Sequence, residues 1–138
     1  MEEKYDFWTT FTVRIGDINY GGHMGNDRFL LLFQDARIRC LQSIGFEETS
    51  IGDGIGVILK EAHVEYLAEV FLGDELEVGV RFFDFKRTGF TMGFLVKRSP
   101  DGRFVAKGTS VMVAFDYNMK KVARLPEIFR EKIGGIGA

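Results

Sequence analysis

One apolar stretch, residues 26–44, limits most strongly what this chain can fold into. Its apolar side chains recur at three- and four-residue steps, the period of an α-helix: Phe29, Leu32, Phe33, Ala36, Cys40, Leu41 and Ile44. Leu30 and Leu31 widen this stripe, so we expect the first two turns to be covered on most sides. Gly45 is a suitable end for the helix, because glycine readily adopts the left-handed conformation that follows a last turn. A helix this apolar needs another layer to cover it.

Alternating apolar and polar residues on both sides of this helix predict β-strands. One strand precedes the helix, and four follow a glycine-rich connection: 8–15, 57–67, 76–82, 90–96 and 103–115. Short turns separate the last four strands, and short turns join antiparallel neighbours. Pro126 precedes a short expected helix at 127–133. We therefore expect an α+β fold, with an antiparallel five-stranded sheet wrapped around one long central helix, in a single domain spanning 1–138.

The composition argues against several classes of protein. The net charge is −2 with both signs interspersed, whereas a nucleic-acid-binding domain presents a basic face. No apolar run reaches the ~20 residues that a membrane-spanning helix needs, and no secretory signal opens the chain. The single Cys40 cannot form an intrachain disulfide. We therefore expect a cytoplasmic protein with no nucleic-acid or membrane partner.

The loop between the first strand and the helix is the candidate site, because it gathers polar groups beside an apolar helix. It contains a carboxylate, two amides and an imidazole, interleaved with glycines, at Asp17, Asn19, Asn26 and His23. These residues also have structural interpretations. Asp17 can cap a turn, Asn19 can be a turn residue, and Asn26 or Asp27 can be the N-cap of the helix. For His23 we favour function, since an imidazole titrates near neutral pH and suits a general base.

The loop and several later segments resemble a known family. The run Asp17–Asn26, followed by Phe33–Arg37, is similar to the acyl-CoA thioesterases of the 4-hydroxybenzoyl-CoA thioesterase type. Three later segments fit the same family: Val64–Leu67, Leu72–Leu76 and Leu125–Glu127. The resemblance covers nearly the whole chain. It implies the hotdog fold and hydrolysis of an acyl or aroyl thioester to free acid and CoA, with a carrier-protein thioester as an alternative substrate.

The chain departs from the family pattern at one position. That pattern is Asp-x-Asp followed by Gly-His-x-x-Asn, which Asp17, Gly22, His23 and Asn26 match, but Asn19 replaces the second Asp. In the 4-hydroxybenzoyl enzyme this second carboxylate attacks the thioester or activates water. A neutral amide can do neither.

The departure leaves more than one hypothesis open. In the leading one, His23 is the general base, Asp17 orients the imidazole or binds the water, and Asn19 bonds the oxyanion or positions the water. The amides at the start of the helix would polarise the carbonyl. The main alternative is a non-catalytic acyl-CoA-binding hotdog protein. A hotdog dehydratase is a third, but those enzymes normally pair a histidine with an acid on the central helix.

Other polar residues have simpler interpretations. His63 alternates onto the polar side of its strand and is expected at the surface. Asp35 and Arg39 are four residues apart on the helix and can form an exposed ion pair. The two histidines, without suitably spaced cysteines, predict no metal site.

The substrate-binding residues follow from the resemblance and from charge. Gly22 and Asn26 are expected to contact the thioester, and Arg87, Thr88 and Gly89, at a predicted turn, to contact the phosphates of CoA. Arg98 and Arg103 lie near the next hairpin. No cofactor is implied beyond CoA as part of the substrate. Family members bind the pantetheine arm between two subunits, so a homodimer or homotetramer is expected.

Overall fold

The computed structural model describes residues 4–99 and 101–134. Its elements follow the order β1 (Phe7–Thr12), a 3-10 turn η1 (Ile15–Asp17), α1 (Asn26–Ser43), β2 (Gly56–Tyr66), β3 (Glu75–Lys86), β4 (Gly89–Ser99), β5 (Arg103–Asp116), β6 (Lys121–Val122) and α2 (Glu127–Gly134). The expected helices and strands are all present, with shifts of a few residues at their ends.

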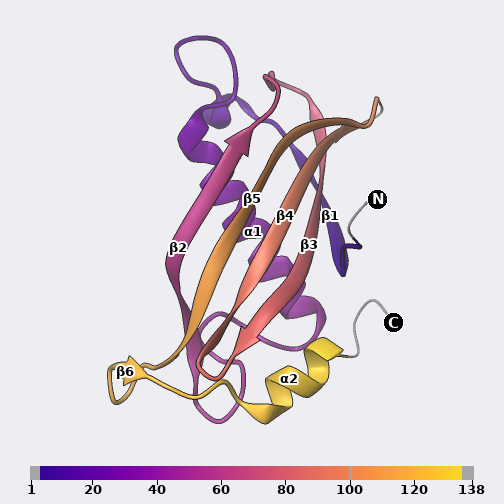
Figure 1. Ribbon diagram of the computed structural model, residues 1–138. Helices are drawn as coiled ribbons and strands as arrows, with labels where there is room; N and C mark the ends of the chain where they lie inside the picture. Colours follow the sequence, from indigo (N-terminus) through magenta and orange to yellow (C-terminus); the bar gives the residue numbers. More distant parts are fainter. Residues whose placement is uncertain (1–3, 100, 135–138) are drawn as a thin grey trace.

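The strands form one antiparallel sheet in the order β1-β3-β4-β5-β2, and β6 pairs with β5 beside that path (Figure 1). Over the part of the chain that the structure describes, the sheet thus has six strands, and the predicted five is wrong. The missed strand β6 has two residues, which is too short to show an alternating pattern. It exists because the chain after β5 turns back and pairs Phe115 with Val122.

One face of the sheet packs against α1. Alternate residues of the two central strands are buried there: Leu76, Val78, Val80 and Phe82 on β3, and Phe90, Met92, Phe94 and Val96 on β4. Phe33 of α1 stacks on Phe94 with ring centroids 4.5 Å apart. Gly108 of β5 allows this close approach, since a Cβ there would lie 2.7 Å from the Phe33 ring. The apolar stripe of α1 and the period-two pattern of the strands therefore meet in one core.

The first turns of α1 are less covered than expected. Leu30 and Leu31 are 45% and 49% exposed, which contradicts the prediction that this half of the helix is covered on most sides. The sheet covers one side of the helix, and within one chain no second layer of the described residues covers the side that carries these leucines. The C-terminal prediction is confirmed, because Gly45 follows the helix with a φ of 85°.

One charged side chain of α1 is buried. Arg37 is 5% exposed, and its guanidinium forms an ion pair with Glu48 in the connection between α1 and β2. The carbonyl of Glu48 accepts a hydrogen bond from the amide of Val57 at 2.7 Å. The pair therefore fastens this connection to the helix at the end remote from the candidate loop.

Candidate active site

The loop between β1 and α1 folds back on itself at one end of the sheet. The amide of Asn19 donates to the carbonyl of His23 at 2.9 Å, and Ile18 and Met24 form an isolated β-bridge. The amide of Met24 donates to the carbonyl of Val70 at 2.7 Å, which docks the loop on the connection between β2 and β3. Residues 19–23 thus form a small hairpin held against the rest of the domain.

Asp17 supports this loop. Its Oδ2 accepts a hydrogen bond from the amide of Arg14 at 2.9 Å and so caps the 3-10 turn. Its carbonyl accepts from the amide of Gly25 at 3.0 Å, immediately before α1. These contacts match the capping interpretation of Asp17.

Asn19 and His23 both present a polar atom to the Cβ side of Gly21. The Asn19 Oδ1 accepts a hydrogen bond from the amide of Gly21 at 2.9 Å. A Cβ on residue 21 would lie 3.2 Å from this oxygen and 3.4 Å from the His23 Nε2. A side chain at residue 21 would therefore crowd both polar atoms, and glycine avoids that crowding.

The imidazole has a preferred tautomer. The His23 Nδ1 lies 3.4 Å from the carbonyl oxygen of Met24. A carbonyl oxygen only accepts hydrogen bonds, so in the neutral ring this contact places the proton on Nδ1. The Nε2, which lies 3.4 Å from the Cβ position of Gly21, then carries the lone pair that can accept a proton.

A hollow of about 250 Å³ lies beside His23 and the start of α1. His23, Asn26, Phe29, Tyr66 and Glu69 are among the residues that line it. The helix begins after Gly25, which is its N-cap and makes no side-chain capping bond. The N-cap prediction of Asn26 or Asp27 is therefore wrong, because the helix starts one residue earlier and glycine has no side chain to cap with. The first-turn amides lie at the edge of the hollow without a capping side chain.

The sequence interpretation missed two polar residues of this hollow, Tyr66 and Glu69. Strand alternation placed Tyr66 on the same face as Val64, but only the fold brings it to the start of α1. Its hydroxyl donates to the carbonyl of Asn26 at 2.9 Å, and its ring meets Phe29 edge-on at 5.3 Å. The segment Val64–Leu67, which carried part of the family resemblance, was the available signal.

Arg87, Thr88 and Gly89 do not join the loop within one chain. They form the β3–β4 turn, whereas the loop is tied to the opposite end of β3, where the Val13 amide donates to the carbonyl of Asp74 at 2.9 Å. β3 has 12 residues, roughly 36–40 Å at ~3.3 Å each. Gly89 is constrained by packing, because a Cβ there would overlap the carbonyl of Met112. The expected phosphate contacts therefore need a second chain.

The guanidinium of Arg98 also has partners within the chain. Its guanidinium bonds the carbonyl of Glu69 at 3.1 Å and pairs with the carboxylates of Asp101 at 3.3 Å and Asp74 at 3.8 Å. Arg98 thus holds the wall of the hollow at Glu69, and it does not have the free guanidinium that a phosphate contact requires.

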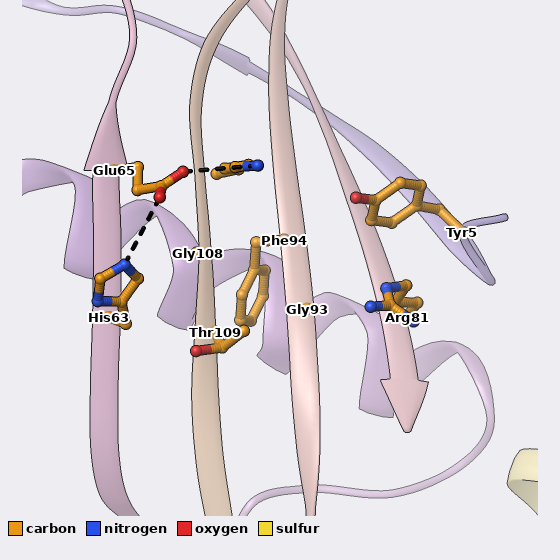
Figure 2. A pocket seen from close by; sticks show the side chains of 9 residues that line it. Tyr5, His63, Glu65, Arg81, Gly93, Phe94, Gly108 and Thr109 are labelled. Carbon is orange, nitrogen blue, oxygen red and sulfur yellow. Dashed lines mark ion pairs between the residues drawn. The ribbon is translucent and has the colours of Figure 1, made fainter. Parts of the chain in front are cut away.

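A second hollow, of about 200 Å³, lies away from the loop on the sheet face opposite α1 (Figure 2). Arg81, Gly93, Thr109 and His63 form one row of cross-strand partners through it. His63 lies 4.0 Å from Glu65, which also pairs with a lysine of β5, Lys107, at 3.5 Å. The surface position predicted for His63 is confirmed, since its side chain is 69% exposed.

The remaining polar predictions concern α1 and metal binding. Asp35 and Arg39 form the expected ion pair, with Nε and Oδ2 3.0 Å apart. Among residues 4–99 and 101–134, no group of three or more His, Cys, Asp or Glu side chains is arranged to hold a metal ion. Over the same residues, no helix has the length and apolar character needed to cross a bilayer.

Solved structures with a similar fold include two thioesterases. A thioesterase from Thermus thermophilus, solved with coenzyme A and Zn, is 32% identical and superposes with a TM-score of 0.79, covering 94% of this chain and 98% of that chain. A 1,4-dihydroxy-2-naphthoyl-CoA thioesterase from Synechocystis is 20% identical with a TM-score of 0.84, covering 94% of this chain and 96% of its own. This second likeness concerns the fold alone. Together with the antiparallel sheet and the helix packed on it, these neighbours support the predicted hotdog fold.

Comparison with curated proteins gives a partial match. The L-carnitine dehydrogenase/betainyl-CoA thioesterase of Agrobacterium fabrum (strain C58 / ATCC 33970) is 28% identical over 125 residues, which are 89% of this chain. The chain spans about a quarter of that relative's length (25%). Residues 13–133, which include the loop, the hollow and both ends of the sheet, match the thioesterase-like superfamily as a whole. The chain therefore belongs to the thioesterase-like superfamily.

Proposed function

We propose that this chain is an acyl-CoA thioesterase of the 4-hydroxybenzoyl-CoA thioesterase type, which hydrolyses an acyl or aroyl thioester to the free acid and CoA. The observation that carries the proposal is the convergence of the Asn19 Oδ1 and the His23 Nε2, which lie 3.2 Å and 3.4 Å from the Cβ position of Gly21. It adjoins a hollow at the uncapped start of α1. This arrangement offers a place for a water molecule and for a carbonyl oxygen.

The water is activated by two acceptors. Bound on the Cβ side of Gly21, at van der Waals distance from its Cα, the water donates one proton to the His23 Nε2. It donates the other to the Asn19 Oδ1, which still has a lone pair beside its bond from the Gly21 amide. As the water oxygen forms its bond to the thioester carbon, His23 takes the first proton. An amide can orient this water although it cannot deprotonate it. Asn19 is therefore compatible with hydrolysis when the base is His23.

The oxyanion forms at the start of α1. The positive end of the helix dipole favours negative charge there, and the first-turn amides have no capping side chain. Collapse of the tetrahedral intermediate breaks the carbon–sulfur bond, and the imidazolium of His23 returns its proton to the departing thiolate. Asp17 acts indirectly, through the hydrogen bonds that hold the turn and Gly25. CoA enters only as part of the substrate.

The CoA moiety is bound between two copies of the chain. β2 lies at one edge of the sheet, and in an antiparallel pair of β2 edges the two chains run in opposite directions. The Arg87–Gly89 turn of one copy then lies at the same end as the loop of the other. The exposed Leu30 and Leu31 supply apolar surface for such an interface. A homodimer or homotetramer is expected, and light scattering at multiples of the 15.7 kDa chain mass tests it.

A cationic acyl group is a second candidate substrate. Glu69 and Tyr66 both line the hollow, and a carboxylate and an aromatic ring are groups that attract a quaternary ammonium group. The Agrobacterium relative is named a betainyl-CoA thioesterase. Glu69→Gln should then lower kcat/KM for betainyl-CoA and leave kcat/KM for a neutral acyl-CoA of similar size unchanged.

Release of free thiol from short, medium, long, aromatic and betainyl CoA esters tests the function. We expect turnover by the wild-type protein and a loss of ~100-fold or more in His23→Ala, the low end for a general base. His63→Ala is the matched control, since His63 lies on the opposite sheet face, and its rate should equal that of the wild type. An unchanged rate in His23→Ala would refute the mechanism. Binding of CoA esters without turnover would favour the non-catalytic alternative.

A further inference from the structure

We infer that Tyr66 is a positioning residue for this reaction, because its hydroxyl holds and polarises the turn of α1 that receives the oxyanion. The inference rests on the proposed function. Tyr66 is the last residue of β2, and its hydroxyl donates to the carbonyl of Asn26, the first residue of α1, at 2.9 Å. One hydrogen bond therefore links the end of an edge strand to the start of the helix.

The acceptor of this bond belongs to a particular peptide unit. The carbonyl of Asn26 and the amide N–H of Asp27 are two ends of the same peptide group. A donor on the carbonyl oxygen withdraws electron density from the unit and makes its N–H a stronger donor, as in other chains of hydrogen bonds. The Asp27 N–H lies in the first turn, where Gly25 supplies no side-chain cap. Tyr66 thus strengthens a donor at the place where negative charge develops.

The ring of Tyr66 fixes where this hydroxyl lies. It meets Phe29 edge-on, with centroids 5.3 Å apart and planes at 79°, and Phe29 is itself buried in the core. The backbone is held as well, since the next amide, that of Leu67, donates to the carbonyl of Val105 at 2.9 Å. A phenylalanine at position 66 would keep the ring contact, so the hydroxyl is the part that serves the helix.

The chain contains a matched tyrosine at the other end of the sheet. The hydroxyl of Tyr117 donates to the carbonyl of Val57 at 2.8 Å, and its exposure of 43% is close to the 48% of Tyr66. Both are phenol-to-backbone bonds of similar length, but Val57 is the second residue of β2, remote from the loop. Tyr117→Phe therefore reproduces the loss of stability without the loss of a contact at the site.

The experiment compares Tyr66→Phe, Tyr117→Phe and the wild type on the best thioester of the panel. In Tyr66→Phe we expect kcat to fall by about 2- to 13-fold, which corresponds to the ~0.5–1.5 kcal/mol of a neutral hydrogen bond. KM should stay unchanged, because the donor acts on charge that forms only in the transition state. The amide proton of Asp27 should shift upfield in the NMR spectrum of Tyr66→Phe, since its peptide loses polarisation. Tyr117→Phe should leave kcat and this resonance unchanged.

Each outcome decides the inference. A lower kcat and a shifted Asp27 resonance in Tyr66→Phe alone would support it. Equal losses of kcat in both variants would overturn it and indicate a general effect of stability. A wild-type kcat in Tyr66→Phe would also overturn it, because the hydroxyl would then have no effect on the reaction. A wild-type protein that turns over no thioester would instead refute the proposed function, and the inference with it. An unshifted Asp27 resonance in an active Tyr66→Phe would refute the polarisation of this peptide.

Discussion

Replacement of Gly21 by alanine tests the water position with the smallest change to the chain. The new methyl carbon would lie 3.2 Å from the Asn19 Oδ1, 3.4 Å from the His23 Nε2 and 3.7 Å from the His23 Cδ2. It would therefore crowd both polar atoms and block the approach of a water molecule to them from this side. The backbone at Gly21 does not adopt the left-handed conformation that penalises other residues, unlike Gly22 with a φ of 85°.

The expected consequences for stability and activity differ. Alanine in an unstrained position restricts the unfolded chain, which is worth about 0.4–1 kcal/mol in favour of folding. The close contact with the Asn19 oxygen offsets some of this, so the unfolding free energy should change by no more than about 1 kcal/mol. Displacement of the water removes the general-base step, whose contribution is ~10²–10⁴-fold. We therefore expect Gly21→Ala to unfold like the wild type and to lose ~100-fold or more in kcat.

The assay pairs urea unfolding with thiol release. Gly16→Ala is the control, because Gly16 has no atom within 4 Å of its Cβ position and no left-handed backbone. This variant should match the wild type in both measurements. A Gly21→Ala protein that is folded and keeps its wild-type kcat would show that no catalytic water lies between Asn19 and His23.

Three further predictions concern the site and the core. Asn19→Asp should keep the hydrogen bond from the Gly21 amide and change kcat by far less than the ~100-fold that loss of a general base costs. A large gain in thiol release would instead show that the amide stands in place of a carboxylate that the reaction needs. Glu48→Ala leaves the buried Arg37 guanidinium without its partner and should lower the unfolding free energy, measured in urea, by ~3 kcal/mol or more. Arg37→Met should lower it by less, because it removes the buried charge itself. Burial raises the pKa of the Cys40 thiol to about 12, so this thiol should resist aromatic disulfide reagents in the native protein at pH 8 and react once unfolded. The pKa of Cys40 is higher in the folded than in the unfolded protein, so the unfolded protein loses this proton first as the pH rises. The contribution of Cys40 to the unfolding free energy is therefore complete below about pH 9 and should fall as the pH rises towards about 12.

Local patterns were enough for the elements that depend on periodicity. The three- and four-residue spacing in α1 and the alternation in β3 and β4 each gave the right element, because burying one face of a helix or strand requires such spacing. The ion pair of Asp35 with Arg39 followed for the same reason, since its two residues are neighbours on one helix.

Other features of the molecule depend on contacts between distant segments. The exposure of Leu30 and Leu31 depends on how far the sheet extends around α1. The position of Arg87 relative to His23 depends on the direction and length of β3. Neither can be obtained from a window of neighbouring residues.

The sequence by itself determined the types of element, the polar loop, and the presence of an imidazole beside a helix start. It could not determine which groups face each other across space. The convergence of Asn19 and His23 on Gly21 results from the hairpin of residues 19–23, and the hydrogen bond from Tyr66 to Asn26 joins residues 40 positions apart. Periodicity is a property of the local chain and can be seen in its letters. The approach of a phenol to a helix start exists only after the sheet and α1 have packed together.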